Sequence, residues 1–315
     1  MNEFDIVGIG QNAVDTLILA DRYPVYAGKE RFQEEILSPG GQVATAMVAC
    51  ARLGLRTRYI GTVGDDNRAR IQRESLIAAG IPAPNLIERP GCTTQSAYIV
   101  IDRSSGERTV LWHRDAALEL RPEEIGPAWL TGARMLHLDA GDLAAATRAA
   151  EHARCLGIPV SLDADTRYPE LGRLFANVDY LIAASGLLEA WTGEPEPARA
   201  IEKTQQEYGC RAVGITLGAQ GCLLRADGKL HYSPGFVVDC ADTTGAGDVF
   251  HGAFCYSVLE VPDPKAMCWP DALDFSNAMA ALNCRAPGAR GAIASREQAV
   301  ELVRTGARRW REGLR

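Results

Sequence analysis

Residues 242–250 read Asp-Thr-Thr-Gly-Ala-Gly-Asp-Val-Phe, and the small and apolar residues that continue to residue 260 predict a helix that begins inside this stretch. The first backbone N–H groups of a helix lack helical partners, and glycines at 245 and 247 let a ligand come close to them. This arrangement suits an anion such as a phosphoryl group. Asp248 falls in the first helical turn, where a carboxylate is able to take the proton of a hydroxyl that attacks phosphorus. An ordinary acid at a helix start would explain Asp248, but it leaves the rest of the run unexplained.

Around this stretch, short apolar runs alternate with helical segments. The pattern predicts buried strands separated by helices, at 4–9, 58–63, 135–138, 159–163, 180–183 and 211–216. Helices are expected at 41–53, 66–79, 142–156, 246–260, 271–284 and 296–304. Two further, antiparallel strands flank the turn at Asp227-Gly228. Such alternation is typical of a mostly parallel sheet with helices on both faces.

Two segments do not fit this alternation. Residues 16–35 are broken by Pro24 and Gly28 and indicate strands, while 95–102 and 107–113 flank a turn signal at Arg103–Gly106 and indicate a hairpin. We therefore predict an α/β protein in which residues 1–15, 36–94 and 114–315 form a three-layer α/β/α core. Residues 16–35 and 95–113 form a small, discontinuous β-sheet lid.

Composition limits the partners and the compartment. The 315 residues carry 33 basic and 40 acidic side chains, a formal net charge of -7, so we expect no nucleic acid partner. No run of 18 apolar residues occurs, so no membrane span is expected, and the first residues lack the features of a signal peptide. Nine cysteines without a Cys-x-x-Cys pair indicate reduced thiols, and hence a cytoplasmic protein.

Two glycine-containing turns are candidate ligand sites. Gly8-Ile9-Gly10 follows the first strand, but the short, β-branched segment up to Pro24 is not the helix that a dinucleotide fold needs. Asn12 and Asp15 instead point to a cleft at a strand end. Gly40-Gly41 runs directly into a helix whose first turn holds Gln42 and Thr45; this is either a ligand-facing loop or an ordinary turn at a helix start.

These stretches together resemble the PfkB-type, or ribokinase-like, carbohydrate kinases. Residues 242–250 resemble the second signature of that family. Gly40-Gly41 with 51–54 and 61–66 resemble the first signature, and 216–221 resemble its nucleotide loop. The resemblance covers nearly the whole chain in the family's order. It implies a ribokinase-like core with a β lid, ATP and Mg²⁺ as cofactors, and in-line phosphoryl transfer to a sugar hydroxyl.

The resemblance also implies roles for individual residues. The base would be Asp248, with an anion hole formed by the amides of Gly245, Ala246 and Gly247. The sugar would be held by Asp15 and by the loop of Gly41 and Gln42, with Asn12 beside them. Family positions near ATP fall on Thr216, Gly218, Gly221 and Asn277. A monovalent cation site, for K⁺ in many relatives, falls on Asp242, Thr244 and the Gly288 loop.

The chain departs from the family pattern in ways that bear on the substrate. Thr45 replaces an asparagine that often contacts the sugar, and 184–187 lack the Asn-x-x-Glu motif associated with magnesium. Arg167 is either a contact of the γ-phosphate or a surface arginine. His113 and Arg114 end the lid hairpin, where they either meet the substrate or make no contact.

Residues 44–46, 249–253 and 285–290 resemble most the sulfofructose kinase and ketohexokinase-like branch, although Lys29 alone matches its sulfonate-binding residues. We therefore expect a sugar kinase acting on a primary hydroxyl, with a ketohexose favoured. One alternative is a nucleoside kinase, for which Trp112 and Phe32 supply a slot for the base; the other is a non-catalytic binding protein. Exposed β alternation in the lid predicts a homodimer through it.

Overall fold

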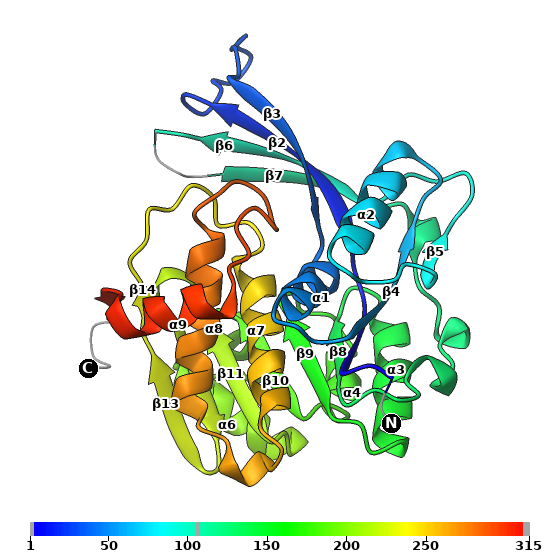
Figure 1. Ribbon diagram of the computed structural model, residues 1–315, viewed down its shortest axis with the longest axis vertical. Helices are drawn as coiled ribbons and strands as arrows, with labels where there is room; N and C mark the ends of the chain where they lie inside the picture. Colours follow the sequence, from blue (N-terminus) through cyan, green and yellow to red (C-terminus); the bar gives the residue numbers. More distant parts are fainter. Residues whose placement is uncertain (1–2, 105–107, 311–315) are drawn as a thin grey trace.

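A nine-stranded sheet forms the centre of the computed structural model (Figure 1), which describes residues 3–104 and 108–310. The strand order is β13-β12-β11-β10-β9-β8-β1-β4-β5. Neighbouring strands are parallel from β11 to β5, and β12 and β13 are antiparallel. The strands are β1 (Ile6–Ile9), β4 (Thr57–Val63), β5 (Leu86–Glu88), β8 (Leu136–Asp139), β9 (Val160–Ala164), β10 (Tyr180–Ala184), β11 (Ala212–Thr216), β12 (Cys222–Ala226) and β13 (Lys229–Ser233). The predicted α/β class and mostly parallel sheet are confirmed.

Helices cover both faces of this sheet because its strands are apolar on both sides. One face packs against α1 (Gln42–Arg52), α2 (Asn67–Ala78), α7 (Ala246–Glu260) and α8 (Trp269–Asn283). The other packs against α3 (Leu143–Cys155), α4 (Leu171–Phe175), α5 (Leu187–Thr192) and α6 (Pro197–Tyr208). The last helix, α9 (Arg296–Thr305), lies on α8. The three layers were predicted from the alternation of strands and helices.

A separate four-stranded sheet projects from the core at the top of Figure 1, and we call it the lid sheet. Its order is β3-β2-β6-β7, with β2 (Ala13–Ala20), β3 (Glu34–Gly40), β6 (Ser96–Asp102) and β7 (Arg108–His113). Strands broken by Pro24 and Gly28 were expected over residues 16–35; within that range, residues 21–33 form no strand. The strands instead reach Ala13 and Gly40, and the expected turn at Arg103–Gly106 lies partly outside the described residues.

The lid sheet joins the core beside the carboxyl ends of three core strands. Three residues separate β1 from β2, and β3 ends at the residue before Gly41, which precedes α1. β1 pairs with β8, and β8 pairs with β9 so that Asp139 lies opposite Asp163. The carboxyl ends of these three strands therefore open beneath the lid, where open α/β sheets bind ligands.

Two short strands that the sequence analysis did not predict form a sheet of their own. A two-stranded sheet joins β14 (Gly235–Phe236) to β15 (Arg308–Arg309), which brings the C-terminal part of the chain next to α8. Among the described residues, no helix has the length and apolar character needed to cross a membrane.

Candidate active site

The glycine loop before α7 has the geometry of an anion site. Gly245 is the N-cap of α7 with φ 74°, a left-handed conformation that favours glycine. A side chain there would also collide with the carbonyl of Ala289. Around Gly247 the space is open, so a ligand is able to approach the unpaired first-turn N–H groups. The amide of Ala246 differs from the expectation, since it donates to Thr243 O at 3.3 Å.

Asp248 lies half-buried in the first turn of α7. Burial raises the pKa of its carboxyl well above the ordinary value, and the negative charges of Asp163, Asp165 and Asp139 raise it further. The positive charge of Arg290 acts in the opposite direction. A carboxyl with a raised pKa is a stronger base once it is ionised, as a proton acceptor requires.

Two acids at adjacent strand ends belong to the site and were missed by the sequence analysis. Asp139 accepts hydrogen bonds from the backbone N–H of Gln11 at 2.7 Å and of Gly141 at 2.9 Å, and burial raises its pKa to about 7. Asp163 lies 3.1 Å from His251 Nε2 on α7. Burial alone would raise the pKa of Asp163, but His251 lowers it below its ordinary value. A signal did exist, because Asp163 ends one predicted strand and Asp139 directly follows another.

The residues expected to hold the sugar meet at the junction of β1, β2 and α1. Burial raises the pKa of Asp15 to about 6, although the backbone of Ala97 and the charge of Arg290 lower it. Asn12 donates to Tyr59 Oη at 3.0 Å and to Thr62 O at 2.8 Å, so the scaffold holds its amide.

Gly41 has φ 90°, and a side chain there would overlap the backbone of Asn12. Gln42 Nε2 donates to Asp163 at 3.5 Å. Thr45 is fully buried, and its hydroxyl accepts a hydrogen bond from Arg290 at 3.2 Å. Arg290 is thus a further site residue that sequence reasoning missed.

Other expected contacts lie apart from this junction. Lys29 is exposed in the segment between β2 and β3, and His113 is exposed at the end of β7. Arg114 forms a two-pronged ion pair with Asp142, with both N–O distances 2.7 Å. The guanidinium of Arg167 lies 5.9 Å from the ring centre of Trp191 on α5.

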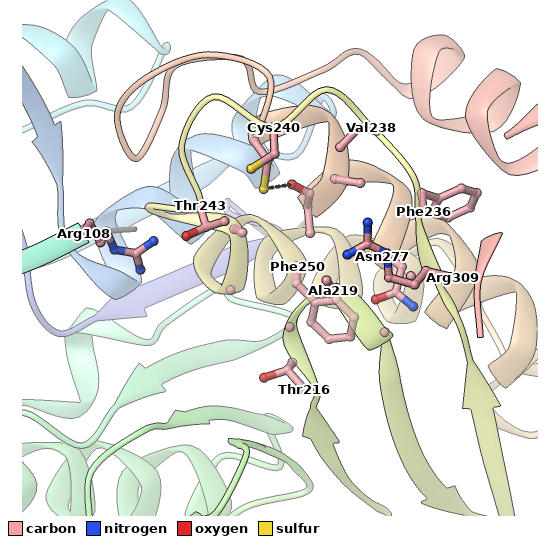
Figure 2. Close-up of a pocket in the computed structure, with 18 residues that line it drawn as sticks. Arg108, Thr216, Ala219, Phe236, Val238, Cys240, Thr243, Phe250, Asn277 and Arg309 are labelled. Carbon is pink, nitrogen blue, oxygen red and sulfur yellow. Dashed lines mark hydrogen bonds between the residues drawn. The ribbon is translucent and has the colours of Figure 1, made fainter. Parts of the chain in front are cut away.

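A cavity of about 360 Å³, which we call the Asn277 cavity, lies beside the glycine loop (Figure 2). It is lined by four of the five residues expected near a nucleotide, Thr216, Gly218, Gly221 and Asn277, whereas Arg167 does not line it. Asn277 Nδ2 donates to the carbonyl and the hydroxyl of Ser233, which fixes its amide in the wall. Figure 2 shows Arg108 of the lid sheet and Arg309 of β15 at opposite ends; neither was predicted, because both come from segments without a motif.

A second cavity of about 430 Å³, the Gln42 cavity, lies under the lid. Three amide side chains line it, those of Gln11, Gln42 and Gln95, together with Trp112. Its charged lining residues are Arg114, Asp115, Glu119, Asp142 and Asp165. Because Arg114 is paired with Asp142, the remaining charges are negative, and the lining suits hydroxyl groups better than an anion.

The family model described as pfkB family carbohydrate kinase matches residues 6–296. The chain belongs to this family. Among curated relatives, the ATP-dependent ribose-1-phosphate kinase of Halopiger xanaduensis is 28% identical to this kinase. The match covers 91% of this kinase and 94% of the relative. This kinase is also 29% identical over 86% of its length to 88% of a fructokinase of Solanum tuberosum.

Solved structures show the same ribokinase-like fold. The ribokinase of Thermotoga maritima matches with a TM-score of 0.79 and 25% identity over 96% of this kinase and all of that chain (100%). An Escherichia coli protein assigned as ribokinase II, solved in complex with ATP and Mg²⁺, matches with a TM-score of 0.83 and 21% identity over 96% and 99%. The expected family and fold are confirmed, as is the enzyme class.

The expected cation positions of this carbohydrate kinase do come together. Asp242 is buried, and its carboxylate accepts hydrogen bonds from the N–H and hydroxyl of Thr244 and from the N–H of Gly288, at 2.7–2.9 Å. These donors occupy the carboxylate, so a monovalent cation would depend mainly on loop carbonyls for its oxygen ligands. Among the described residues, no group of three or more His, Cys, Asp or Glu side chains is arranged to hold a metal ion.

Proposed function

We propose that this kinase transfers the γ-phosphoryl group of ATP to a primary hydroxyl group of a small sugar, with a ketohexose favoured. The observation that carries the proposal is that Asp248 is next to lining residues of the Asn277 cavity and is influenced by a lining residue of the Gln42 cavity. Ala246 and Gly247, which directly precede Asp248, line the Asn277 cavity. Asp165 lines the Gln42 cavity with Gln42, and its charge raises the pKa of Asp248. Nucleotide and sugar would therefore meet at the start of α7.

In the proposed reaction, the sugar hydroxyl oxygen forms a bond to the γ-phosphorus while the bond from that phosphorus to the β-phosphate oxygen breaks. The hydroxyl proton passes to the ionised carboxylate of Asp248, and ADP leaves. First-turn N–H groups of α7 stabilise the charge on the transferring group, and Arg108 and Arg309 favour the anionic nucleotide. Mg²⁺ would enter with ATP and offset phosphate charge, since it commonly needs only one or two protein carboxylates.

The acceptor side supports a hydroxyl-rich, uncharged sugar. Asp15 is an acid able to accept hydrogen bonds from two hydroxyls, and the Gln42 cavity adds amide donors and acceptors. The named relatives act on different sugars, so they do not decide between a ketohexose and a pentose. One observation favours the nucleoside kinase as a second candidate: Trp112 is 71% exposed and lines the Gln42 cavity, where its ring is able to stack on a flat base.

A panel of sugars and nucleosides tests the proposal by measuring acceptor-dependent ADP release. We expect phosphorylation of a sugar and none of nucleosides; the reverse pattern would identify a nucleoside kinase. Asp248→Asn should lower kcat by roughly 10²-fold or more and leave ATP binding within about twofold, because the amide cannot take the proton. ATP and sugar binding without turnover in the wild type would instead indicate a non-catalytic protein.

Three further features belong to this proposal. K⁺ is the expected cation beside Asp242, Thr244 and Gly288. A reducing, cytoplasmic environment suits the nine free cysteines. The lid sheet would form a homodimer: pairing register places Leu37, Tyr98 and Leu111 in one cross-strand row with Thr16, and their exposed fractions are 47%, 48% and 64%. Thr16 itself is buried and accepts a hydrogen bond from Arg68, but the three exposed apolar side chains of the row fit a second copy of the same face.

A further inference from the structure

All three nitrogen atoms of the Arg290 guanidinium donate hydrogen bonds. Nε donates to Thr45 Oγ1 at 3.2 Å, Nη1 to Ser75 Oγ at 2.9 Å, and Nη2 to Gly40 O at 2.9 Å. These acceptors belong to α1, to α2 and to the last residue of lid strand β3. One side chain thereby connects three elements to the loop that follows α8.

The loop that carries Arg290 lies between the two glycine loops of the site. A Cβ atom on Gly40 would lie 3.2 Å from Ala289 Cβ and 3.0 Å from Asp15 Oδ2. A Cβ atom on Gly245 would collide with the carbonyl of the same Ala289. Asn283 Nδ2 donates to that carbonyl at 3.0 Å, which holds the loop against the end of α8. Movement of this loop would therefore disturb the acceptor side and the anion site together.

The charge of Arg290 reaches the two acids that the proposed reaction uses. Burial lowers the pKa of Arg290 to about 10, while Tyr59, Asp248 and Asp15 raise it, so the side chain is charged at neutral pH. In return it lowers the pKa of both carboxyls.

Asp15 and Asp248 each have further charged neighbours of their own. Asp15 also faces Arg68, which lowers its pKa, and Asp242, which raises it. Asp248 faces Asp139 of β8, Asp163 of β9 and Asp165, which directly follows β9, and all three raise its pKa. The charge of Arg290 acts on both carboxyls, so its loss would raise the pKa of each.

We infer that Arg290 is the positioning residue of this kinase. It fixes the Gly40-Gly41 turn, the glycine loop before α7 and lid strand β3 relative to one another, and its charge acts on Asp15 and Asp248. The inference rests on the proposed function, because it assigns the acceptor and the base to these acids. Arginine suits the task because its planar fork presents donors in several directions, whereas lysine offers a single charged nitrogen.

Replacing Arg290 tests the inference in the full-length enzyme. Arg290→Gln should lower kcat/KM for the acceptor sugar by about 10²-fold, as small misplacements of reacting groups do. On the acidic side of its kcat/KM profile, the midpoint of the acidic limb should rise by about one pH unit, because the positive charge that favours the ionised carboxylates is lost. Arg290→Lys keeps the charge, so its limb should stay near that of the wild type while kcat/KM falls. Arg285→Gln, an exposed arginine in the same loop, is the matched control and should change neither.

The outcomes separate the inference from the proposed function. An Arg290→Gln enzyme with wild-type kcat/KM and an unmoved acidic limb would overturn the inference while the wild-type activity upholds the function. A wild type that phosphorylates no sugar removes the proposed function, and the inference with it. Should Arg290→Gln not fold, Ser75→Ala decides: it removes one anchor and keeps the charge. A drop in kcat/KM with an unmoved limb supports the positioning role, and an unchanged kcat/KM contradicts it.

Discussion

At the scale of single residues, the site is a group of buried and half-buried acids with few compensating cations. Asp15, Asp139 and Asp248 all have a raised pKa, for which burial is the largest cause. Burying a charge is costly, so each carboxyl is closer to the neutral form than a surface aspartate would be. A substrate that donates hydrogen bonds to these carboxyls would favour their ionised forms, which makes the empty and occupied sites electrostatically different.

This electrostatic state predicts the pH dependence of the reaction. Asp15 has a pKa of about 6 and that of Asp248 is also raised, so both protonate at higher pH than ordinary aspartates. Because the reaction needs both ionised, kcat/KM for the sugar should fall as pH drops, with a midpoint of about 6 or above. The measurement is a kcat/KM profile between pH 5 and pH 9 at constant ionic strength. A profile that stays flat down to pH 5 would refute the expectation.

Asp15 affects folding stability in the opposite direction to activity: raising the pH favours the reaction but lowers the free energy of unfolding. The pKa of Asp15 is raised from 3.8 to about 6, so its contribution to stability is fully present below pH 3.8 and is lost as pH rises through about 6. Asp15 therefore costs stability in the pH range where the enzyme would work, as is common for groups at functional sites.

At the scale of elements, α1 and α7 must lie close together to bring Gln42 and Asp248 to one place. Gly252 on α7 permits this, since a Cβ atom there would lie 2.5 Å from Ala46 O and 2.8 Å from Ala49 Cβ. The helix pair thus depends on a residue without a side chain, one turn after the proposed base.

Gly252→Val should force the two helices apart. We expect the free energy of unfolding to fall by about 1–3 kcal/mol, as for other overpacked cores, and kcat to fall because Asp248 moves with α7. Thermal unfolding and steady-state kinetics measure both effects. The control is Gly126→Ala, which replaces a glycine with φ −105° and no atom near its Cβ position, and which should change stability by less than about 0.5 kcal/mol. Equal melting temperatures for Gly252→Val and the wild type would contradict this account of the packing.

The same elements show what sequence patterns are able to predict. The parallel strands other than β5, and α7, were predicted because apolar period and glycine stops are local properties of the chain. The roles of Asp139 and Arg290 were not, because they depend on strand order and on a loop that meets residues more than 200 positions away. β15 is two residues long and has no periodic signal, so Arg309 was unpredictable as a lining residue. Local patterns therefore predicted the elements, and the three-dimensional contacts complete the site.

At the scale of the whole molecule, the lid sheet is the element with the least cover. It projects from the core (Figure 1). Its strand β2 carries Asp15, and its strand β7 carries Arg108, which lines the Asn277 cavity. A sheet of four strands with an apolar row on an open face gains stability when a second copy covers it. Assembly and catalysis would then be linked, because the same strands serve both.

The proposed dimer predicts how the mass and the activity of the enzyme change together. The wild type should have twice the 34.0 kDa chain mass by light scattering at micromolar concentration. Leu111→Lys places a charge in the exposed row and should yield monomers with a higher KM for the sugar, because β2 loses the support of the covered sheet. Leu156→Lys is the matched control: that leucine is 50% exposed at the end of α3, away from the lid sheet, and its variant should remain a dimer with unchanged KM. A wild type that is monomeric throughout this concentration range would show that the row has another role.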